Sequence, residues 1–224
     1  YKAVLTHGYV VDDKGRKMSK SLGNTIAPEK VIKKWGADIL RLWVASADYT
    51  SDVKVSDGLF KQVSEVYRRI RNTCRFLVQN IADFDPQKDY VSYDKLTSLD
   101  KWALGRLAEL SDKVTQAYDE FQFHIVFHAV HNFCAVDMSA LYLDILKDRL
   151  YCDAKESQSR KAAQTVLYEI TKNLVPLFAP IIPHTADEVY NYLPGEKEES
   201  VFLAGWPTIK PEFRNKELME EYEK

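Results

Sequence analysis

Apolar residues recur every three or four positions over most of this chain, which is the period of an α-helix with one buried face. The longest such stripe predicts a helix over residues 57–82, and it consists of Leu59, Val63, Val66, Ile70, Cys74, Leu77 and Ile81. Further helices are expected at 99–121, at 123–150, from Ser157 or Ser159 to Phe178, and at 185–192. Short connections between these helices favour an antiparallel bundle.

Residues typical of helix ends refine these boundaries. Asp57 is expected to cap the long helix, and Thr185 with Glu188 forms the sequence of a capping box. A kink is expected near Asp137. The helix that ends at Phe178 is expected to be broken by prolines, namely Pro176, Pro180 and Pro183.

The first 56 residues have a different pattern. Residues 1–11 are rich in β-branched and aromatic residues, which predicts a strand that is broken at His7 and Gly8. Two short helices follow, one with Pro28 in its first turn and one with Asp38 as its cap. We expect the first to run to Trp35 and the second over 38–47. Residues 48–56 lack a helical period and are predicted to form a linker.

Residues 15–24 read GRKMSKSLGN and carry the most distinctive chemistry. Lys17 and Lys20 stand among serines and between Gly15 and Gly23. Glycine lets the backbone approach a ligand closely, and lysine is a compact charge that suits phosphate. The stretch therefore predicts a cationic phosphate-binding loop. A solvated surface turn is the usual interpretation of two lysines at this spacing, and only a longer match outweighs it.

That longer match exists. Residues 17–21 are the KMSKS sequence of class I aminoacyl-tRNA synthetases, followed by Leu22, Gly23 and Asn24, and by Gly36-Ala37-Asp38 one helix later. The chain resembles the branch that activates isoleucine, valine and leucine. The stretches RLWVAS (41–46), YRRIRN (67–72) and YLDILKDR (142–149) are most similar to the bacterial-type isoleucyl enzymes. The resemblance covers residue 1 to about residue 207.

The resemblance implies a mainly α chain in which an antiparallel helical bundle follows the end of a Rossmann-like α/β catalytic domain. Residues 1–49 would be the end of the catalytic domain, 50–207 the anticodon-binding domain, and 208–224 an acidic C-terminal tail. ATP would be bound by Lys17, Met18, Ser19, Lys20 and Ser21. Lys17 and Lys20 would be catalytic, with Lys20 on an ATP phosphate and Met18 holding the loop. ATP with Mg²⁺, isoleucine and tRNA(Ile) are the implied cofactor and partners.

Two groups of cations are candidates for contact with tRNA. At about 100° per residue, Lys61, Arg68, Arg71 and Arg75 lie opposite the apolar stripe of their helix. They could follow an RNA backbone, or they could form a solvated face with Glu65 as a partner. Lys147 and Arg149 form the second group. The net charge of −2 favours neither alternative.

Other features narrow the function classes. His124, His128 and His131 share one side of a helix, but no carboxylate or cysteine completes a metal set, so we expect packed or solvated histidines. The three cysteines are far apart, which gives no zinc site and suits a reducing cytosol. No apolar run is long enough for a membrane span, and no signal peptide is visible. A monomeric cytoplasmic protein is expected.

Some features of the resembled family are not found in this sequence. They are the His-x-Gly-His motif, the inserted editing domain and the cysteine-bound zinc module, the last being the only place where zinc is expected. We therefore expect a piece of a longer enzyme that forms no adenylate alone. The alternatives are the same region of a valyl or leucyl enzyme, an RNA-binding helical module without catalysis, or an interaction bundle with a chance basic loop. The residues do not indicate which anticodon bases are read.

Overall fold

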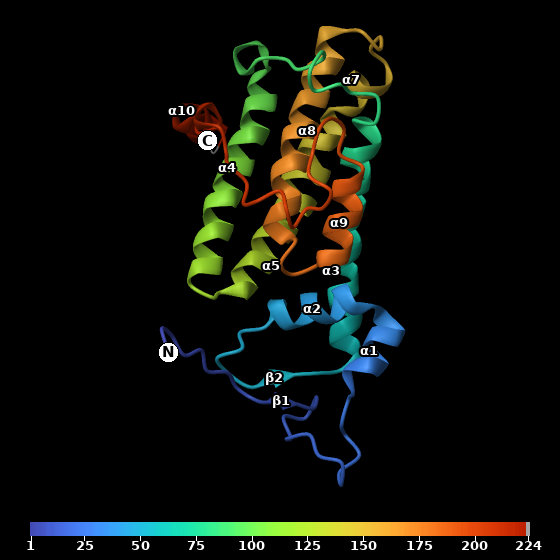
Figure 1. Ribbon diagram of the computed structural model, residues 1–224, viewed down its shortest axis with the longest axis vertical. Coiled ribbons are helices and arrows are strands. Elements are labelled where there is room, and N and C mark those ends of the chain that lie inside the picture. Colours follow the sequence, from blue (N-terminus) through green and yellow to red (C-terminus); the bar gives the residue numbers. More distant parts are fainter. Residues whose placement is uncertain (223–224) are drawn as a thin grey trace.

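The computed structural model describes residues 1–222, and most of them are helical (Figure 1). The bundle is built by α3 (Asp57–Asn80), α4 (Ser98–Asp119), α5 (Phe123–Asn132), α8 (Gln158–Phe178) and α9 (Pro183–Asn191). A short 3₁₀ helix, η1 (Tyr93–Lys95), lies in the loop before α4. The prediction of a mainly α fold with a helical bundle is confirmed.

Helix α8 is the centre of the bundle because it contacts α3, α4, α7 and α9. Its predicted apolar stripe is buried, including Val166, Ile170 and Leu174. Pro176 lies inside α8 and does not break it, so that prediction is wrong. Proline in a helix costs one hydrogen bond and a steric clash. Here the residues around Pro176 are buried on every side of the helix, and this packing outweighs the cost.

The single helix predicted over 123–150, with a kink near Asp137, is divided into several helical segments, and Asp137 lies in a segment that is not α-helical. That segment is a π-helix, η2 (Phe133–Tyr142), which follows α5 directly. Two short helices then complete the region, α6 (Leu143–Ile145) and α7 (Lys147–Tyr151). The wider turn of a π-helix shifts backbone carbonyls away from the α-helical pattern. One of them, the Cys134 carbonyl, accepts a hydrogen bond of 3.1 Å from the Thr73 hydroxyl of α3.

Two strands lie below the bundle in Figure 1. β1 (Val10–Val11) pairs in parallel with β2 (Val53–Lys54). The predicted strand over 1–11 is thus reduced to two residues, and the predicted linker over 48–56 contains a strand. Neither strand is long enough to show an alternating pattern, and the two strands are more than 40 residues apart in the sequence. Because their pairing is non-local, the local sequence pattern reveals neither the short length of β1 nor the presence of β2.

Two helices lie between β1 and β2 in the sequence, namely α1 (Pro28–Trp35) and α2 (Ala37–Ser46). Gly36 separates them with a φ of 98°, a conformation that glycine adopts without steric cost. The predicted first helix, from Pro28 to Trp35, is confirmed. In Figure 1, α2 lies across the lower end of the bundle, between the bundle and the two strands.

Several predicted caps are replaced by others. Ser56, not Asp57, caps α3, since its hydroxyl accepts the N–H of Leu59. Helix α9 begins at Pro183, so Thr185 lies inside its first turn and the predicted capping box is wrong. Ser157 caps α8, which selects the first of the two predicted starts.

The acidic C-terminal segment folds back on the bundle. It forms η3 (Pro211–Phe213) and α10 (Lys216–Tyr222), and α10 contacts α4. Met219 is buried there, and the Arg214 guanidinium pairs with Asp112 of α4. The predicted tail therefore packs against the helical bundle over residues 208–222. Residues 223–224 are not among those that the structure describes.

Candidate functional site

The carboxylate of Asp12 anchors the lysine-bearing loop at its base. Asp12 is 7% exposed and accepts the backbone N–H groups of Lys14 and Arg16 at 3.1 and 2.8 Å. It also accepts Nε of Arg16 at 2.9 Å and Nδ2 of Asn24 at 3.0 Å. The hydrogen bond from Asn24, followed by those from Arg16, holds the pKa of Asp12 well below its usual range. The anchor is therefore an ionised group.

Short polar side chains close the other end of the loop. Oδ1 of Asn24 accepts the N–H of Ser19 at 2.9 Å, and Nδ2 of Asn24 lies 3.4 Å from the carbonyl of Lys17. The Ser19 hydroxyl accepts the N–H of Leu22 at 3.2 Å and lies 3.1 Å from the Ser21 hydroxyl. The loop thus has a defined turn rather than an extended surface course.

The two lysines of this loop are exposed. The ammonium group of Lys17 lies 4.8 Å from the centre of the Tyr9 ring, and Lys20 forms no ion pair within residues 1–222. Met18 is half-buried and packs against the core, as predicted. All five residues predicted to bind ATP therefore lie in one anchored turn. Two exposed positive charges on such a turn can bind a phosphate chain.

All four predicted cations of α3 are exposed, which confirms the outer face inferred from the sequence. Arg68 pairs with Glu65 at 2.6 Å, and Arg71 pairs with Glu188 of α9 at 3.4 Å. Lys61 and Arg75 form no ion pair among the described residues. Each of the two pairs is more than half exposed on both sides, so it contributes little and a polyanion can compete for it.

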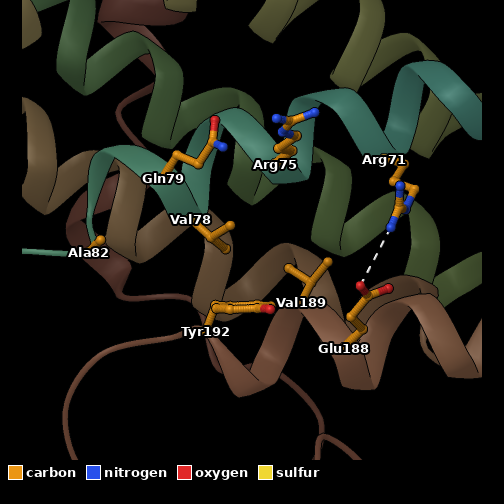
Figure 2. A pocket seen from close by; sticks show the side chains of 8 residues that line it. All are labelled: Arg71, Arg75, Val78, Gln79, Ala82, Glu188, Val189 and Tyr192. Atoms are coloured by element: carbon orange, nitrogen blue, oxygen red, sulfur yellow. Dashed lines mark hydrogen bonds and ion pairs between the residues drawn. The ribbon is translucent and has the colours of Figure 1, made fainter.

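A groove of about 400 Å³ lies between α3 and α9 beside these cations. Figure 2 shows Val78 of α3 directed across the gap toward Val189 of α9 and toward Tyr192, which follows α9, and Arg71 directed toward Glu188. The groove is lined by Arg71, Arg75, Val78, Gln79, Ala82, Glu188, Val189 and Tyr192. We call it the α3–α9 groove.

The lining of the α3–α9 groove suits an unpaired nucleotide. Tyr192 is 65% exposed, and its ring can stack on a base while the arginines contact phosphate. Neither Tyr192 nor Gln79 was among the residues predicted from the sequence to bind RNA. No local signal identifies Tyr192, because it meets α3 only through the packing of a helix more than 100 residues later.

The two cations of the second predicted group, Arg149 and Lys147, differ in their surroundings. The Arg149 guanidinium donates to both carboxylate oxygens of Asp100 at 2.8 and 3.0 Å, and to the Ser159 carbonyl at 3.0 Å. Asp100 is fully buried, so Arg149 is committed to the interior of the bundle. Lys147 is exposed and pairs with Asp144 at 2.6 Å. Lys147 and Arg149 both belong to α7, which lies at the end of the bundle farthest from the strands in Figure 1.

The three histidines do not form a metal site in residues 1–222, because this part contains no group of three His, Cys, Asp or Glu side chains placed to hold an ion. Burial, with Arg69 and His128 nearby, lowers the pKa of His131. Over the same residues, no helix has the length and apolar character needed to cross a membrane.

Comparison with known families separates the chain into two matched regions. Residues 1–56 match the family described as tRNA synthetases class I (I, L, M and V). Residues 100–224 match the family described as the anticodon-binding domain of tRNA ligase. The chain belongs to this anticodon-binding family of the class I tRNA synthetases.

Within the class, the similar curated proteins are isoleucine–tRNA ligases. Identity is 56% over 226 residues for Moorella thermoacetica, 54% over 222 for Geobacter sulfurreducens and 57% over 207 for Brevibacillus brevis. These matches cover 100%, 99% and 92% of this chain, and 24%, 24% and 22% of the relatives. The chain thus spans about a quarter of the length of its curated relatives, and the isoleucyl resemblance is confirmed.

Solved structures share the fold. One is a ternary complex of the Agrobacterium radiobacter LeuRS with tRNA and LeuAMS, at 22% identity and a TM-score of 0.70. It covers 93% of this chain and 24% of that one. Another is the Mycobacterium tuberculosis methionyl-tRNA synthetase with methionyl-adenylate, at 18% identity and a TM-score of 0.70, which covers 93% of this chain and 43% of that one. At these identities the likeness concerns the fold alone.

Proposed function

We propose that this chain is the part of an isoleucine–tRNA ligase that binds ATP phosphates through residues 17–21 and tRNA(Ile) through the cationic face of α3. The supporting observation is an anchored turn with two exposed lysines, in a chain more than half identical to isoleucine–tRNA ligases over its whole length. Division at about residue 49 into a catalytic end and an RNA-binding bundle is part of the proposal, as is a monomeric enzyme in the cytoplasm.

The reaction joins the isoleucine carboxylate to the α-phosphorus of ATP, and pyrophosphate leaves. Negative charge accumulates on the departing phosphates, so cations aimed there lower the barrier more than they strengthen substrate binding. Lys20 would contact a phosphate directly, and Lys17 would support it. The hydroxyl groups of Ser19 and Ser21 would add hydrogen bonds. Mg²⁺ would enter with ATP, and we assign no zinc to these residues.

The α3 face would bind the tRNA backbone. Lys61 and Arg75 are 14 residues apart, which is roughly 21 Å along a helix. This length is sufficient to follow several phosphates of one strand. At one end of the face, the α3–α9 groove would hold an unpaired nucleotide with its base against Tyr192. Arg149 is not included in this surface, since its donors are occupied inside the bundle.

A salt titration of tRNA(Ile) binding to the 224-residue chain tests this surface. Arg75→Ala should reduce the slope of log affinity against log salt by about one, because one phosphate contact is lost. Lys113→Ala is the matched control. Lys113 is an exposed cation on α4, which lies across the bundle from α3 in Figure 1, and its removal should leave the slope unchanged.

Circular dichroism of all three proteins shows whether the bundle remains folded. Equal slopes for the parent chain and both variants would remove Arg75 from the proposed tRNA surface. A reduced slope for Lys113→Ala alone would place the RNA on the α4 side instead.

A further inference from the structure

Two charged residues of α2 hold the turn that joins α8 to α9. The carboxylate of Asp38 accepts the N–H and the hydroxyl of Thr185 at 2.8 and 2.6 Å, and the N–H of His184 at 3.4 Å. The Arg41 guanidinium donates to the carbonyls of Pro180 and Ile181 at 2.7 and 2.9 Å. We call this pair the α2 clamp. Asp38, predicted as the cap of its own helix, is used instead on a helix nearly 150 residues later.

The charges of the α2 clamp match the ends of the two helices. Unpaired carbonyls make the C-terminal end of a helix negative, and unpaired N–H groups make the N-terminal end positive. Arg41 meets the carbonyls that follow α8, and Asp38 meets the first N–H groups of α9. No side chain of its own caps the start of α9, so Asp38 supplies that cap from another element.

The contact made by Asp38 is buried and specific. Asp38 is 7% exposed and Thr185 is 3% exposed. The Thr185 hydroxyl also lies 2.9 Å from the Tyr67 hydroxyl of α3, so α2, α3 and α9 meet at one point. A buried carboxylate with three hydrogen-bond donors tolerates little displacement, because any movement leaves a charge without partners.

The α2 clamp lies between the two parts of the proposed site. The lysine-bearing loop and α1 lead directly into α2, whereas α9 carries Glu188 and Val189 of the α3–α9 groove and is followed directly by Tyr192. A rigid contact at this point fixes the groove relative to the segment that bears the loop. A tRNA molecule that engages both the groove and the catalytic end depends on this fixed geometry.

We propose that Asp38 and Arg41 are positioning residues for tRNA. They hold the α3–α9 groove in the orientation that presents bound tRNA to the catalytic end, and they touch neither ATP nor tRNA themselves. This inference rests on the proposed function. It separates two steps of the reaction: adenylate formation needs no tRNA and is independent of the α2 clamp, while transfer to tRNA depends on it.

The test uses Asp38→Asn in a complete isoleucine–tRNA ligase that contains this segment. Asn keeps the shape of the side chain but removes its charge and one acceptor oxygen. The kcat/KM for tRNA(Ile) should fall roughly tenfold to 10²-fold, the scale of a small misplacement far from the chemistry. Isoleucine-dependent ATP–pyrophosphate exchange should stay within about twofold of the parent enzyme.

Asp57→Asn is the matched control. Asp57 joins α3 to α1 through Lys34 at 2.7 Å, in a pair that is exposed on both sides. The same chemical change at this neighbouring junction should alter neither rate. Thermal unfolding of both variants measures any general loss of stability.

Equal loss of both rates in Asp38→Asn, or no change in the tRNA-dependent rate, would overturn the proposal. If Asp38→Asn does not fold, Thr185→Val decides, since it removes the hydroxyl that donates to Asp38 and contacts Tyr67 but leaves the Asp38 charge and its backbone donors in place. It should shift the ratio of the two rates in the same direction by a smaller factor, and an unchanged ratio overturns the proposal. An effect of Arg75→Ala on tRNA binding without an effect of Asp38→Asn would refute the α2 clamp and leave the groove intact.

Discussion

Arg149→Ala should destabilise the chain strongly because it leaves the Asp100 carboxylate buried without a countercharge. Asp100 is fully buried, and the Arg149 side chain is only 19% exposed. The remaining side-chain donor to Asp100 is the Tyr142 hydroxyl at 2.7 Å, with the Thr97 N–H more distant at 3.3 Å. Removal of one partner of a buried ion pair typically costs about 3–5 kcal/mol.

The loss can be measured by urea unfolding followed by circular dichroism at 25 °C. At about 2–4 °C per kcal/mol for a chain of this size, the midpoint of thermal unfolding should fall by about 6–20 °C. Lys147→Ala is the control on the same helix. Lys147 and Asp144 are 53% and 65% exposed, so the loss of this solvent-screened pair should change the stability little.

A loss of stability for Arg149→Ala that is no larger than that of Lys147→Ala would refute this reasoning. It would mean that Asp100 is not held as a charge by Arg149. If tRNA binding also fell in that variant while its stability did not, the RNA contact expected for Arg149 from the sequence would apply after all.

Two further predictions concern the loop and a histidine. Lys20→Ala in a complete ligase should slow single-turnover adenylate formation by roughly 10²–10³-fold with little change in isoleucine binding, since the charge acts on the transition state; an unchanged rate would exclude Lys20 from that role. The lowered pKa of His131 means that the unfolded chain binds this proton more readily than the folded chain. The free energy of unfolding should therefore fall as the pH drops from about 7 to about 5, and fall less in His131→Asn. Identical pH dependence in the two proteins would contradict the shift.

The sequence by itself determined the features that depend on neighbouring residues. The apolar period located the helices because each buries one face whatever it packs against, and it correctly placed Lys61, Arg68, Arg71 and Arg75 on the outside of α3. The ten residues from Gly15 to Asn24 identified the loop and its class, because that chemistry lies within one short segment.

Tertiary structure alone decided where the polar groups that join distant elements find their partners. Asp38 has the sequence context of a helix cap and Arg149 that of an exposed cation near a helix end. In the fold, Asp38 accepts hydrogen bonds from the start of α9, and Arg149 donates to the buried carboxylate of Asp100. The packing of distant elements likewise brings Tyr192 to the α3–α9 groove and pairs Val53 with Val10. A buried charge or strand edge must be satisfied, but any compatible partner in the chain can satisfy it, so only the packing of the elements selects one.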